Sequence, residues 1–474
     1  MDFSKVVFKR RFALNMYKDH KLMLGKMSFS KDFVNDLRGD PYPIISSNKP
    51  DEAVADNVWR LRSGSVTRWL SPFFPYATYT LSVNHLFGSA GFEFRLPDLR
   101  AVIAVCDHRL VFDCELRHES ISLPDSITAP FTFMVSCRPG AFDVYFLLNG
   151  NASFFHTFLS DSFADSACQS VFSSGCCAVS VSGEAEISAA FSCMDCGISQ
   201  ADLRPIRYEN GDVMLEGGKL FLTASIRMQE NMFQGVFSWI PGTAEFELTG
   251  TLFFDAGDGR WCGDVASSIL YNRSAKQYYL WVCSFNNGHI LGHAAFDGDP
   301  RFGVNVIDIE LMEKASPNSE LTDFVGFEGD EDPDFFFDDE QNRWFMAICR
   351  LDPSQNAYRY LFFESERPFD GYRFIGCGND GAETGGSFVK IDGERIFVCG
   401  NSFEKVSDYR IYTKVGMKNA EFDLPDGGFR GWGTLIPVKL GTRTRYFWIT
   451  FDRHNGSEFN WSYGNIYCFE ADIR

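Results

Sequence analysis

Long apolar runs and helical periodicity are both scarce in this sequence of 474 residues. No window of 18 apolar residues occurs, so no transmembrane helix is predicted. The first 24 residues, MDFSKVVFKRRFALNMYKDHKLML, carry a charge every few positions and contain no apolar stretch typical of a signal peptide. We therefore expect a cytoplasmic protein that has no membrane partner.

An excess of basic residues is also absent. The chain has 63 Asp and Glu against 44 Lys and Arg, which gives a formal net charge of −19. Nucleic acids and anionic membranes bind through basic patches. The composition therefore excludes both as main partners and suits a neutral substrate.

A second metal-binding motif is missing as well. Cys193 and Cys196 form one C-x-x-C motif among 14 cysteines, but no matching pair or histidine cluster accompanies it. A structural zinc site needs four ligands at set spacing. We predict no metal there, and we expect reduced thiols that mostly fill the core.

Aromatic and strand-forming residues are abundant instead. The chain has 49 Phe and 17 Tyr, and 45% of its residues are hydrophobic, which is enough for a full core. From about Ser63, segments such as TRWLSPFFPYATYTLSV and CCAVSVSGEAEISAAFSC alternate with period two between turn residues. This pattern predicts an N-terminal extension over residues 1–44 and a β-sandwich over residues 45–203.

A repeat of about 50 residues follows from residue 204. Each copy has a polar or Gly-rich start, a short apolar strand, a turn and a strongly apolar second strand. Four strands in 40–50 residues are typical of a propeller blade. The sequence therefore predicts an all-β chain whose residues 204–474 form a five-bladed β-propeller. The five copies are YENGDVMLEGGKLFLTASIR, WCGDVASSILYNRSAKQYYLWVCSF, DEDPDFFFDDEQNRWFMAICR, AETGGSFVKIDGERIFVCGNSF and RGWGTLIPVKLGTRTRYFWITFD.

Acidic residues recur where these copies start. In a propeller the inner strands of all blades begin beside a central funnel, so residues at these positions converge in space. The aligned positions are Asp212, Asp264, Asp332, Glu383 and the Gly431–Trp432–Gly433 turn. Carboxylates held close together shift each other's pKa, which is typical of sites that need an acid and a base at one pH. Capping of a turn and binding of a structural cation in the funnel are the alternative uses of these acids.

Three motifs resemble those of the five-bladed propeller glycoside hydrolases, namely the invertase and levansucrase group and the family 43 arabinanases and xylosidases. The segment from Trp261, with its later Gly292–His293–Ala294, is similar to the first-blade Trp-x-Asn-Asp-Pro motif. The segment EDPDFFFDDEQNRWFMA resembles the Arg-Asp-Pro motif, with Glu331 in place of Arg, and ETGGSFVKIDGERIFV resembles the blade that carries the acid/base Glu. The flanking Asn and Pro are Gly263 and Val265 here, and the sandwich precedes the propeller. We therefore interpret the chain as a distant relative in a separate family.

The resemblance implies hydrolysis of a small oligosaccharide, such as a fructo- or arabinofuranoside, without a cofactor. Glu383 is the expected general acid, Asp264 the nucleophile or base, and Asp332 the stabiliser. Asp212 is the main rival for the role of nucleophile or base. The expected substrate-binding residues are Trp261, His289, His293, Glu331, Arg350 and Trp432.

Two other classes of function stay open at this stage. A carbohydrate-binding propeller would need the aromatic residues but no acid with a raised pKa. A phosphorylase or transglycosylase on the same fold would share the acids, and a phosphorylase would also need a cationic pocket. The sandwich could bind glycan, complete the active site or form a homo-oligomer. Asp338, Asp339 and Glu340 are predicted to be solvated turn residues.

Overall fold

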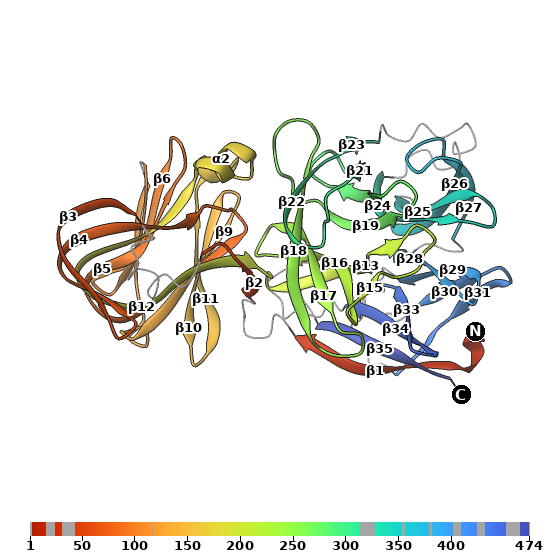
Figure 1. The fold of residues 1–474 in the computed structure, drawn as a ribbon, viewed down its shortest axis with the longest axis horizontal. Helices are drawn as coiled ribbons and strands as arrows, with labels where there is room; N and C mark the ends of the chain where they lie inside the picture. The colour runs from red at the N-terminus through yellow and green to blue at the C-terminus, as the bar shows by residue number, and fades with distance from the viewer. Residues whose placement is uncertain are drawn as a thin grey trace. The chain divides into compact units, whose positions relative to one another are not determined.

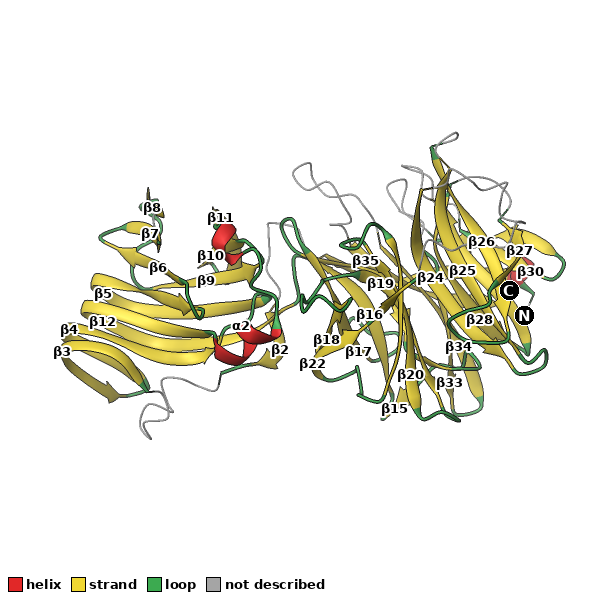
Figure 2. Ribbon diagram, turned by 90° about the horizontal axis from the view of Figure 1, so that it is seen from above, coloured by secondary structure: helices red, strands yellow, loops and turns green. Residues whose placement is uncertain are grey.

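The computed structural model describes residues 2–15, 24–30, 43–115, 117–312, 328–352, 356–378, 382–401, 409–423, 432–451 and 465–473. It contains two compact units, and strands dominate both (Figures 1 and 2). One unit comprises Met1–Lys18, Gly197–Asp258 and Cys262–Arg474, and the other comprises Asp19–Cys196 and Gly259–Trp261. In the residues that the structure describes, the helices are the short η1 (Phe3–Lys5), η3 (Asp161–Phe163) and α2 (Gln169–Ser174). Within the described ranges, no helix is long and apolar enough to cross a membrane.

The first unit is a five-bladed β-propeller, as predicted. Blade I contains β13 (Ser199–Pro205), β16 (Lys219–Arg227), β17 (Met232–Trp239), β18 (Phe246–Asp255) and β22 (Gly303–Asp308), with β15 (Leu215–Glu216) beside β16. Blade II contains β14 (Arg207–Tyr208), β19 (Val265–Asn272), β20 (Gln277–Ser284), β21 (Ile290–Phe296) and β23 (Glu310–Leu311).

Blades III and IV are four-stranded sheets. Blade III contains β24 (Glu328–Asp338), β25 (Arg343–Asp352), β26 (Ala357–Ser365) and β27 (Arg373–Cys377). Blade IV contains β28 (Glu383–Ile391), β29 (Glu394–Asn401), β30 (Arg410–Thr413) and β31 (Gly416–Asn419).

Blade V joins the two ends of the chain. It contains β33 (Thr434–Leu440), β34 (Arg443–Phe451), β35 (Asn465–Ile473), β1 (Val6–Asn15) and β32 (Glu421–Phe422). Strand β1 pairs antiparallel with β35, beside which Figure 1 shows it. Residues 6–15 are therefore a strand of the propeller, and the prediction of an N-terminal extension over residues 1–44 is wrong for them. The propeller also resumes at Gly197, several residues before the predicted boundary at 203/204.

Two stacked arginines fill the propeller axis. The Arg204 guanidinium donates to the carbonyls of Ala266, Asp332, Pro333 and Gly386, which belong to blades II, III and IV. Three residues further along the chain, the Arg207 guanidinium donates hydrogen bonds to Ser268, Asp334 and Phe388 in the same three blades. The matching order of these contacts shows that the inner strands β13, β19, β24 and β28 run in the same direction, so all four begin on one face.

The second unit is also all-β. Its strands are β2 (Leu24–Ser28), β3 (Ile44–Ala55), β4 (Val58–Pro72), β5 (Ala77–Arg95), β6 (Arg100–Cys106), β7 (Arg109–Cys114), β8 (Arg117–Ser122), β9 (Phe131–Arg138), β10 (Ala141–Leu148), β11 (Asn151–Leu159) and β12 (Cys176–Asp195). They form one hydrogen-bonded network, in which β5 pairs first with β9 and then with β6. Figure 2 shows β3, β4, β12 and β5 as long neighbouring strands. Buried rings such as Tyr79, Phe94 and Phe142 fill the core of this unit.

Candidate active site

The inner strands of four blades begin with the same β-bulge. Their pairing with the second strand shifts between Ala201/Arg204, Val265/Ser268, Glu331/Asp334 and Thr384/Ser387. Inside each bulge one residue has a positive φ, and these residues are Asp202 (56°), Ala266 (56°), Asp332 (51°) and Gly385 (60°). Bulges redirect side chains and are frequent beside active sites, and a positive φ at a residue other than glycine is uncommon. Asp202 and Asp332 therefore occupy equivalent positions in blades I and III.

A second set of equivalent positions lies two residues before each bulged residue. These positions hold Gln200, Asp264, Asp330 and Glu383. Asp264 and Glu383 are therefore equivalent, as predicted, whereas the true counterpart of Glu383 in blade III is Asp330. Because the inner strands run in one direction, both sets of acids lie on the same face of the propeller.

Two buried thiols report how closely these acids approach one another. The pKa of Cys283 is raised by burial and by the negative charges of Glu331, Asp332, Asp264 and Asp330. The pKa of Cys349 is raised by burial and by Asp332, Glu331 and Glu383. Like charges gathered at one face make the protonation of each acid depend on the others.

Glu383 is fully buried at the start of β28. Its Oε1 accepts hydrogen bonds from Arg410 (3.0 Å) and from the Tyr412 hydroxyl, and its Oε2 accepts one from the backbone of Tyr360 (3.4 Å). Burial raises the pKa of Glu383, and the bonds from Tyr412 and Arg410 offset only part of that rise. Gly378 lies directly against the carboxyl group, because a Cβ there would come within 1.7 Å of Oε2. The site thus holds one carboxyl group that favours its protonated form.

Asp332 reaches across from blade III to blade IV. Its Oδ2 accepts hydrogen bonds from the Thr384 hydroxyl (2.9 Å) and from the backbone N–H of Gly385 (3.0 Å). Thr384 directly follows Glu383, so the two acids meet at neighbouring residues of one strand. This geometry fixes the Asp332 carboxylate close to the proposed acid.

Asp202 is the acid that the sequence alignment missed. It is 5% exposed, and its Oδ2 accepts a 3.4 Å hydrogen bond from Arg227 on β16, with which it forms an ion pair. The connection between the first two strands spans residues 206–218 in blade I but only 339–342 in blade III, which obscured the match. The spacing of Asp202 before Arg204 and of Asp332 before Asp334 is the signal that would have revealed it.

Asp264 is fully buried in blade II. Its carboxyl group accepts hydrogen bonds from the Ser284 hydroxyl (2.6 Å) and from the side chain (2.9 Å) and backbone (3.2 Å) of Asn286. Burial raises its pKa beyond the lowering effect of these bonds. In the part of the chain that the structure describes, no basic side chain pairs with it.

Three predicted substrate-binding residues do lie among these acids. The His289 Nε2 is 3.0 Å from Glu331 Oε1, which also accepts a 2.7 Å hydrogen bond from the Tyr358 hydroxyl. Burial lowers the pKa of His289, but the Glu331 carboxylate outweighs that effect and the pKa is raised. Arg350 forms an ion pair with Asp330.

Four other predicted residues lie elsewhere. Asp212 is exposed in a turn after β14, bonded to Asn210, and the adjacent Glu209 contacts the far end of β24 at Phe337. The alignment of Asp212 with the blade starts is therefore wrong. The inner strand of blade I is β13, which ends at Pro205, and the turn that holds Asp212 follows that end. Asp212 therefore lies at the opposite end of the inner strands from the bulges.

The two predicted tryptophans are buried and His293 is half-buried, all three in packing contacts. Trp261 belongs to the second unit, where its ring contacts Phe74 and Phe172. Trp432 is 2% exposed and stacks on the Arg204 guanidinium at 4.9 Å. The His293 ring lies between Trp281 and Phe369, and burial lowers its pKa. None of these three rings is an open platform for a sugar, and Gly431 lies outside the described residues.

A funnel cation has no room at the level of the axial arginines, because the Arg204 guanidinium occupies that position. Across the described ranges, no cluster of three His, Cys, Asp or Glu side chains could hold a metal ion. Cys193 and Cys196 are buried, and neither forms a disulfide. As predicted, Asp339 and Glu340 are exposed turn residues, and the Asp338 carboxylate accepts backbone hydrogen bonds within that turn.

Known proteins were compared with the chain at the level of sequence and of structure. No protein-family profile and no curated protein sequence matches it. Solved structures similar to it include the catalytic domain of a GH62 α-L-arabinofuranosidase from Coprinopsis cinerea, with 12% identity, a TM-score of 0.37, and coverage of 58% of this chain and 90% of that one. A GH43 β-1,3-galactosidase in complex with galactodeoxynojirimycin has 10% identity, a TM-score of 0.36, and coverage of 56% and 90%.

A carbohydrate-binding module, CBM66 from Bacillus subtilis, is also similar, with 12% identity and a TM-score of 0.25 over 32% of this chain and 94% of the module. At such identities and TM-scores the chemistry of these proteins does not transfer to this chain.

Proposed function

We propose that the chain is a glycoside hydrolase that cleaves a neutral oligosaccharide with carboxyl groups from three blades. The observation that carries this proposal is the convergence of Asp202, Asp332 and Glu383 on one propeller face, with different environments. Glycosidic cleavage needs one carboxylic acid to protonate the leaving oxygen and one carboxylate to act as nucleophile or base. Environments that separate the pKa values of neighbouring carboxyl groups supply that pair.

Glu383 suits the role of general acid, because its burial raises its pKa and keeps the proton available. Asp202 suits the role of nucleophile or base, because it lies on the same face of the propeller as Glu383 and forms an ion pair with Arg227. This assignment replaces Asp264, whose fully buried carboxyl group has a raised pKa and no basic partner among the described side chains. Asp332, held by Thr384 and Gly385, would orient the substrate and stabilise the developing positive charge.

The charge of the site supports a neutral sugar. Six carboxyl groups (Asp202, Asp264, Asp330, Glu331, Asp332 and Glu383) gather with four basic groups (Arg227, His289, Arg350 and Arg410), and each basic group pairs with one of the acids. An anionic sugar would face excess negative charge, and phosphorolysis would lack an uncommitted arginine among these residues. We propose a furanoside such as an arabinoside or fructoside as the first substrate to test.

The test is turnover of two glycosides of one sugar, a nitrophenyl glycoside and an unactivated disaccharide, by the wild type and two variants. Glu383→Gln should lose about 10²- to 10⁴-fold in kcat on the disaccharide. The loss should be much smaller on the nitrophenyl glycoside, because that leaving group needs no proton. Asp202→Asn should lose activity on both substrates.

Glu340→Gln is the matched control, since it makes the same change in an exposed turn and should leave kcat unchanged. Near-normal disaccharide turnover by Glu383→Gln would sink the acid assignment. Sugar binding without turnover by the wild type would favour the non-catalytic carbohydrate-binding propeller.

A further inference from the structure

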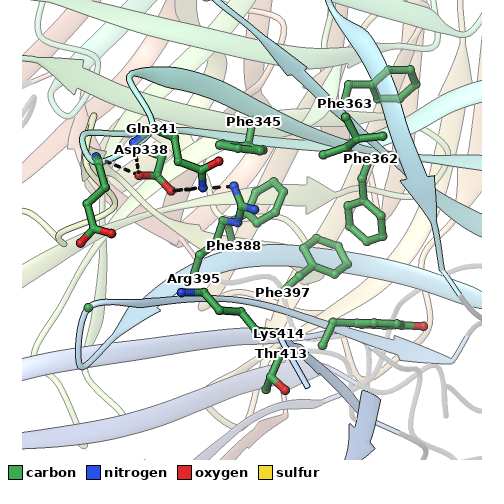
Figure 3. Close-up of a pocket in the computed structure, with 14 residues that line it drawn as sticks. Asp338, Gln341, Phe345, Phe362, Phe363, Phe388, Arg395, Phe397, Thr413 and Lys414 are labelled. Carbon is green, nitrogen blue, oxygen red and sulfur yellow. Dashed lines mark hydrogen bonds and ion pairs between the residues drawn. The ribbon is translucent and has the colours of Figure 1, made fainter. Parts of the chain in front are cut away.

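A pocket of about 220 Å³ lies between blades III and IV, away from the candidate active site (Figure 3). The β24–β25 turn, Gly393 and the Thr413–Lys414 turn surround it. Asp338 in this lining is six residues beyond Asp332 on β24, which is roughly 20 Å along a strand. The pocket therefore belongs to the opposite end of the inner strands from Glu383.

Aromatic rings from both blades form the walls of the pocket. Phe362 of blade III contacts Phe397 of blade IV with ring centroids 5.0 Å apart, and Phe388 contacts Phe397 at 5.1 Å. Phe345 and Tyr412 complete this lining, and Figure 3 shows several of the rings turned toward the same space. Concave sites lined by rings with a few polar groups are typical of small-molecule sites.

Arg395 and Lys414 are the basic groups of this pocket, whose lining also includes the acids Asp338 and Glu340. The Arg395 guanidinium lies 3.5 Å from the centroid of the Phe345 ring, and its side chain is 30% exposed. The nearest acid, Asp338, is 3.9 Å away, and the Asp338 oxygens already accept hydrogen bonds from Glu340 and Gln341. Across the described ranges no acceptor receives a hydrogen bond from Arg395, and its buried NH1 has only the 3.9 Å charge contact with Asp338 Oδ2.

A half-buried arginine that donates no hydrogen bond is costly. A buried donor without a partner costs about 1–3 kcal/mol, and more when the donor is charged. Burial also lowers the pKa of Arg395, which agrees with poor solvation of its charge. A carboxylate matches the planar guanidinium with two parallel hydrogen bonds and would remove this cost.

We propose that this pocket binds a small aromatic carboxylate, with its ring among Phe362, Phe388 and Phe397 and its carboxylate on Arg395. The rings of the wall supply the apolar contact, and Arg395 supplies both charge and direction. A neutral ring lacks the partner for Arg395, and a small aliphatic acid lacks the ring contacts.

One side chain connects this pocket to the candidate acid. Tyr412 lines the pocket, and its hydroxyl donates to the Glu383 carboxyl group. A ring bound against Tyr412 would therefore alter a hydrogen bond that lowers the pKa of Glu383. This consequence rests on the proposed function, whereas the binding itself does not.

Binding is tested by titration calorimetry of the full chain with 2-naphthoate, 2-naphthalenemethanol and acetate. 2-Naphthoate should bind at least about tenfold more tightly than either of the others, as expected for one charge-assisted hydrogen-bonded pair. Arg395→Met keeps the apolar stem over Phe345 and should weaken 2-naphthoate binding by a similar factor. Arg443→Met removes an exposed arginine that is the first residue of β34 in blade V, and it should leave the affinity unchanged.

Absence of 2-naphthoate binding, or equal binding of the alcohol, would overturn the proposal. Ile375→Glu is a second test variant in case Arg395→Met misfolds. Ile375 is 43% exposed at the pocket, and a carboxylate there should repel the ligand. Unchanged affinity in both pocket variants would also refute it. If the wild type hydrolyses a glycoside, 2-naphthoate should shift its pH–rate profile and should not do so in Tyr412→Phe. If no glycoside is cleaved, the proposed function fails and the calorimetric result still stands.

Discussion

At the scale of single residues, the acids of the candidate site differ in the groups that hold them. Glu383 has a raised pKa because burial outweighs the bonds from Tyr412 and Arg410, whereas Asp202 faces the charge of Arg227. One face of the propeller thus brings together acids whose immediate contacts differ. The proposed roles of the two acids rest on this difference in their contacts.

Tyr412→Phe tests how the pKa of Glu383 is set. The hydroxyl donates to the ionised carboxylate and lowers the pKa, so its removal should raise the pKa further. A general acid works only when protonated, so the alkaline limb of kcat/KM should move to higher pH. Tyr372→Phe is the control, since its hydroxyl donates to the Pro368 carbonyl and not to Glu383. An alkaline limb that stays in place in Tyr412→Phe would show that Glu383 is not the titrating acid.

Asp264→Asn separates stability from catalysis. The folded pKa of Asp264 is raised above its unfolded value, so the group contributes stability below the unfolded pKa and loses it as pH rises through the folded pKa. The amide cannot ionise, so the variant should have a higher Tm than the wild type at pH 8 and a similar Tm at pH 4. Glycosidase activity should persist if Asp202 is the base. A lower Tm at pH 8, measured by calorimetry, would contradict this account.

At the scale of elements, the axial arginines explain how five sheets share one centre. Arg204 on β13 bonds carbonyls of three neighbouring blades and stacks on Trp432 beside blade V. Buried carbonyls at the starts of inner strands need donors, and the guanidinium supplies several from one side chain.

Arg204→Met should therefore destabilise the propeller strongly. Loss of the guanidinium leaves several buried carbonyls without donors, at about 1–3 kcal/mol each, so a total loss of at least ~3 kcal/mol is expected. Arg273→Met is the control, because that arginine pairs with Glu209 near the surface and should cost less than about 1 kcal/mol. Urea unfolding followed by near-UV circular dichroism measures both. Equal losses in the two variants would show that the axial contacts contribute little.

The sequence revealed those features whose signal is local. Period-two strands and turns repeat every 50 residues, so the five blades and the order of Asp264, Asp332 and Glu383 could be predicted. Asp202 was missed because the connection from its strand β13 to the paired strand β16 is longer than the matching connection in blade III. Trp261 and Trp432 were wrongly predicted to bind substrate, because an aromatic residue beside a turn has the same sequence pattern whether it lines a funnel or fills a core.

At the scale of the whole molecule, the propeller closes by joining residues from opposite ends of the chain. Strand β1 pairs with β35 over the register Val6↔Ile473 to Asn15↔Asn465. This pairing has no local sequence signal, which is why β1 was assigned to an extension. The second unit lies between β1 and β13 in sequence, so the propeller is discontinuous and its closure depends on contacts of very high sequence separation.

Phe8→Ala tests whether this closure stabilises the whole ring. Phe8 is 1% exposed on β1, and its ring contacts Phe422 at 4.9 Å and Trp448 at 5.3 Å, both in blade V. Truncation of a buried Phe costs about 3–5 kcal/mol, and here the loss should release β1 and expose the edge of β35. Phe87→Ala, at a 77% exposed position of the second unit, is the control and should be nearly neutral. Hydrogen exchange should show faster exchange along β35 and β34 in Phe8→Ala, while the inner strands of blades II and III keep their protection at first. Uniform exchange across all blades would instead mean that the ring opens as one unit, and an unchanged β35 would mean that β1 is dispensable for closure.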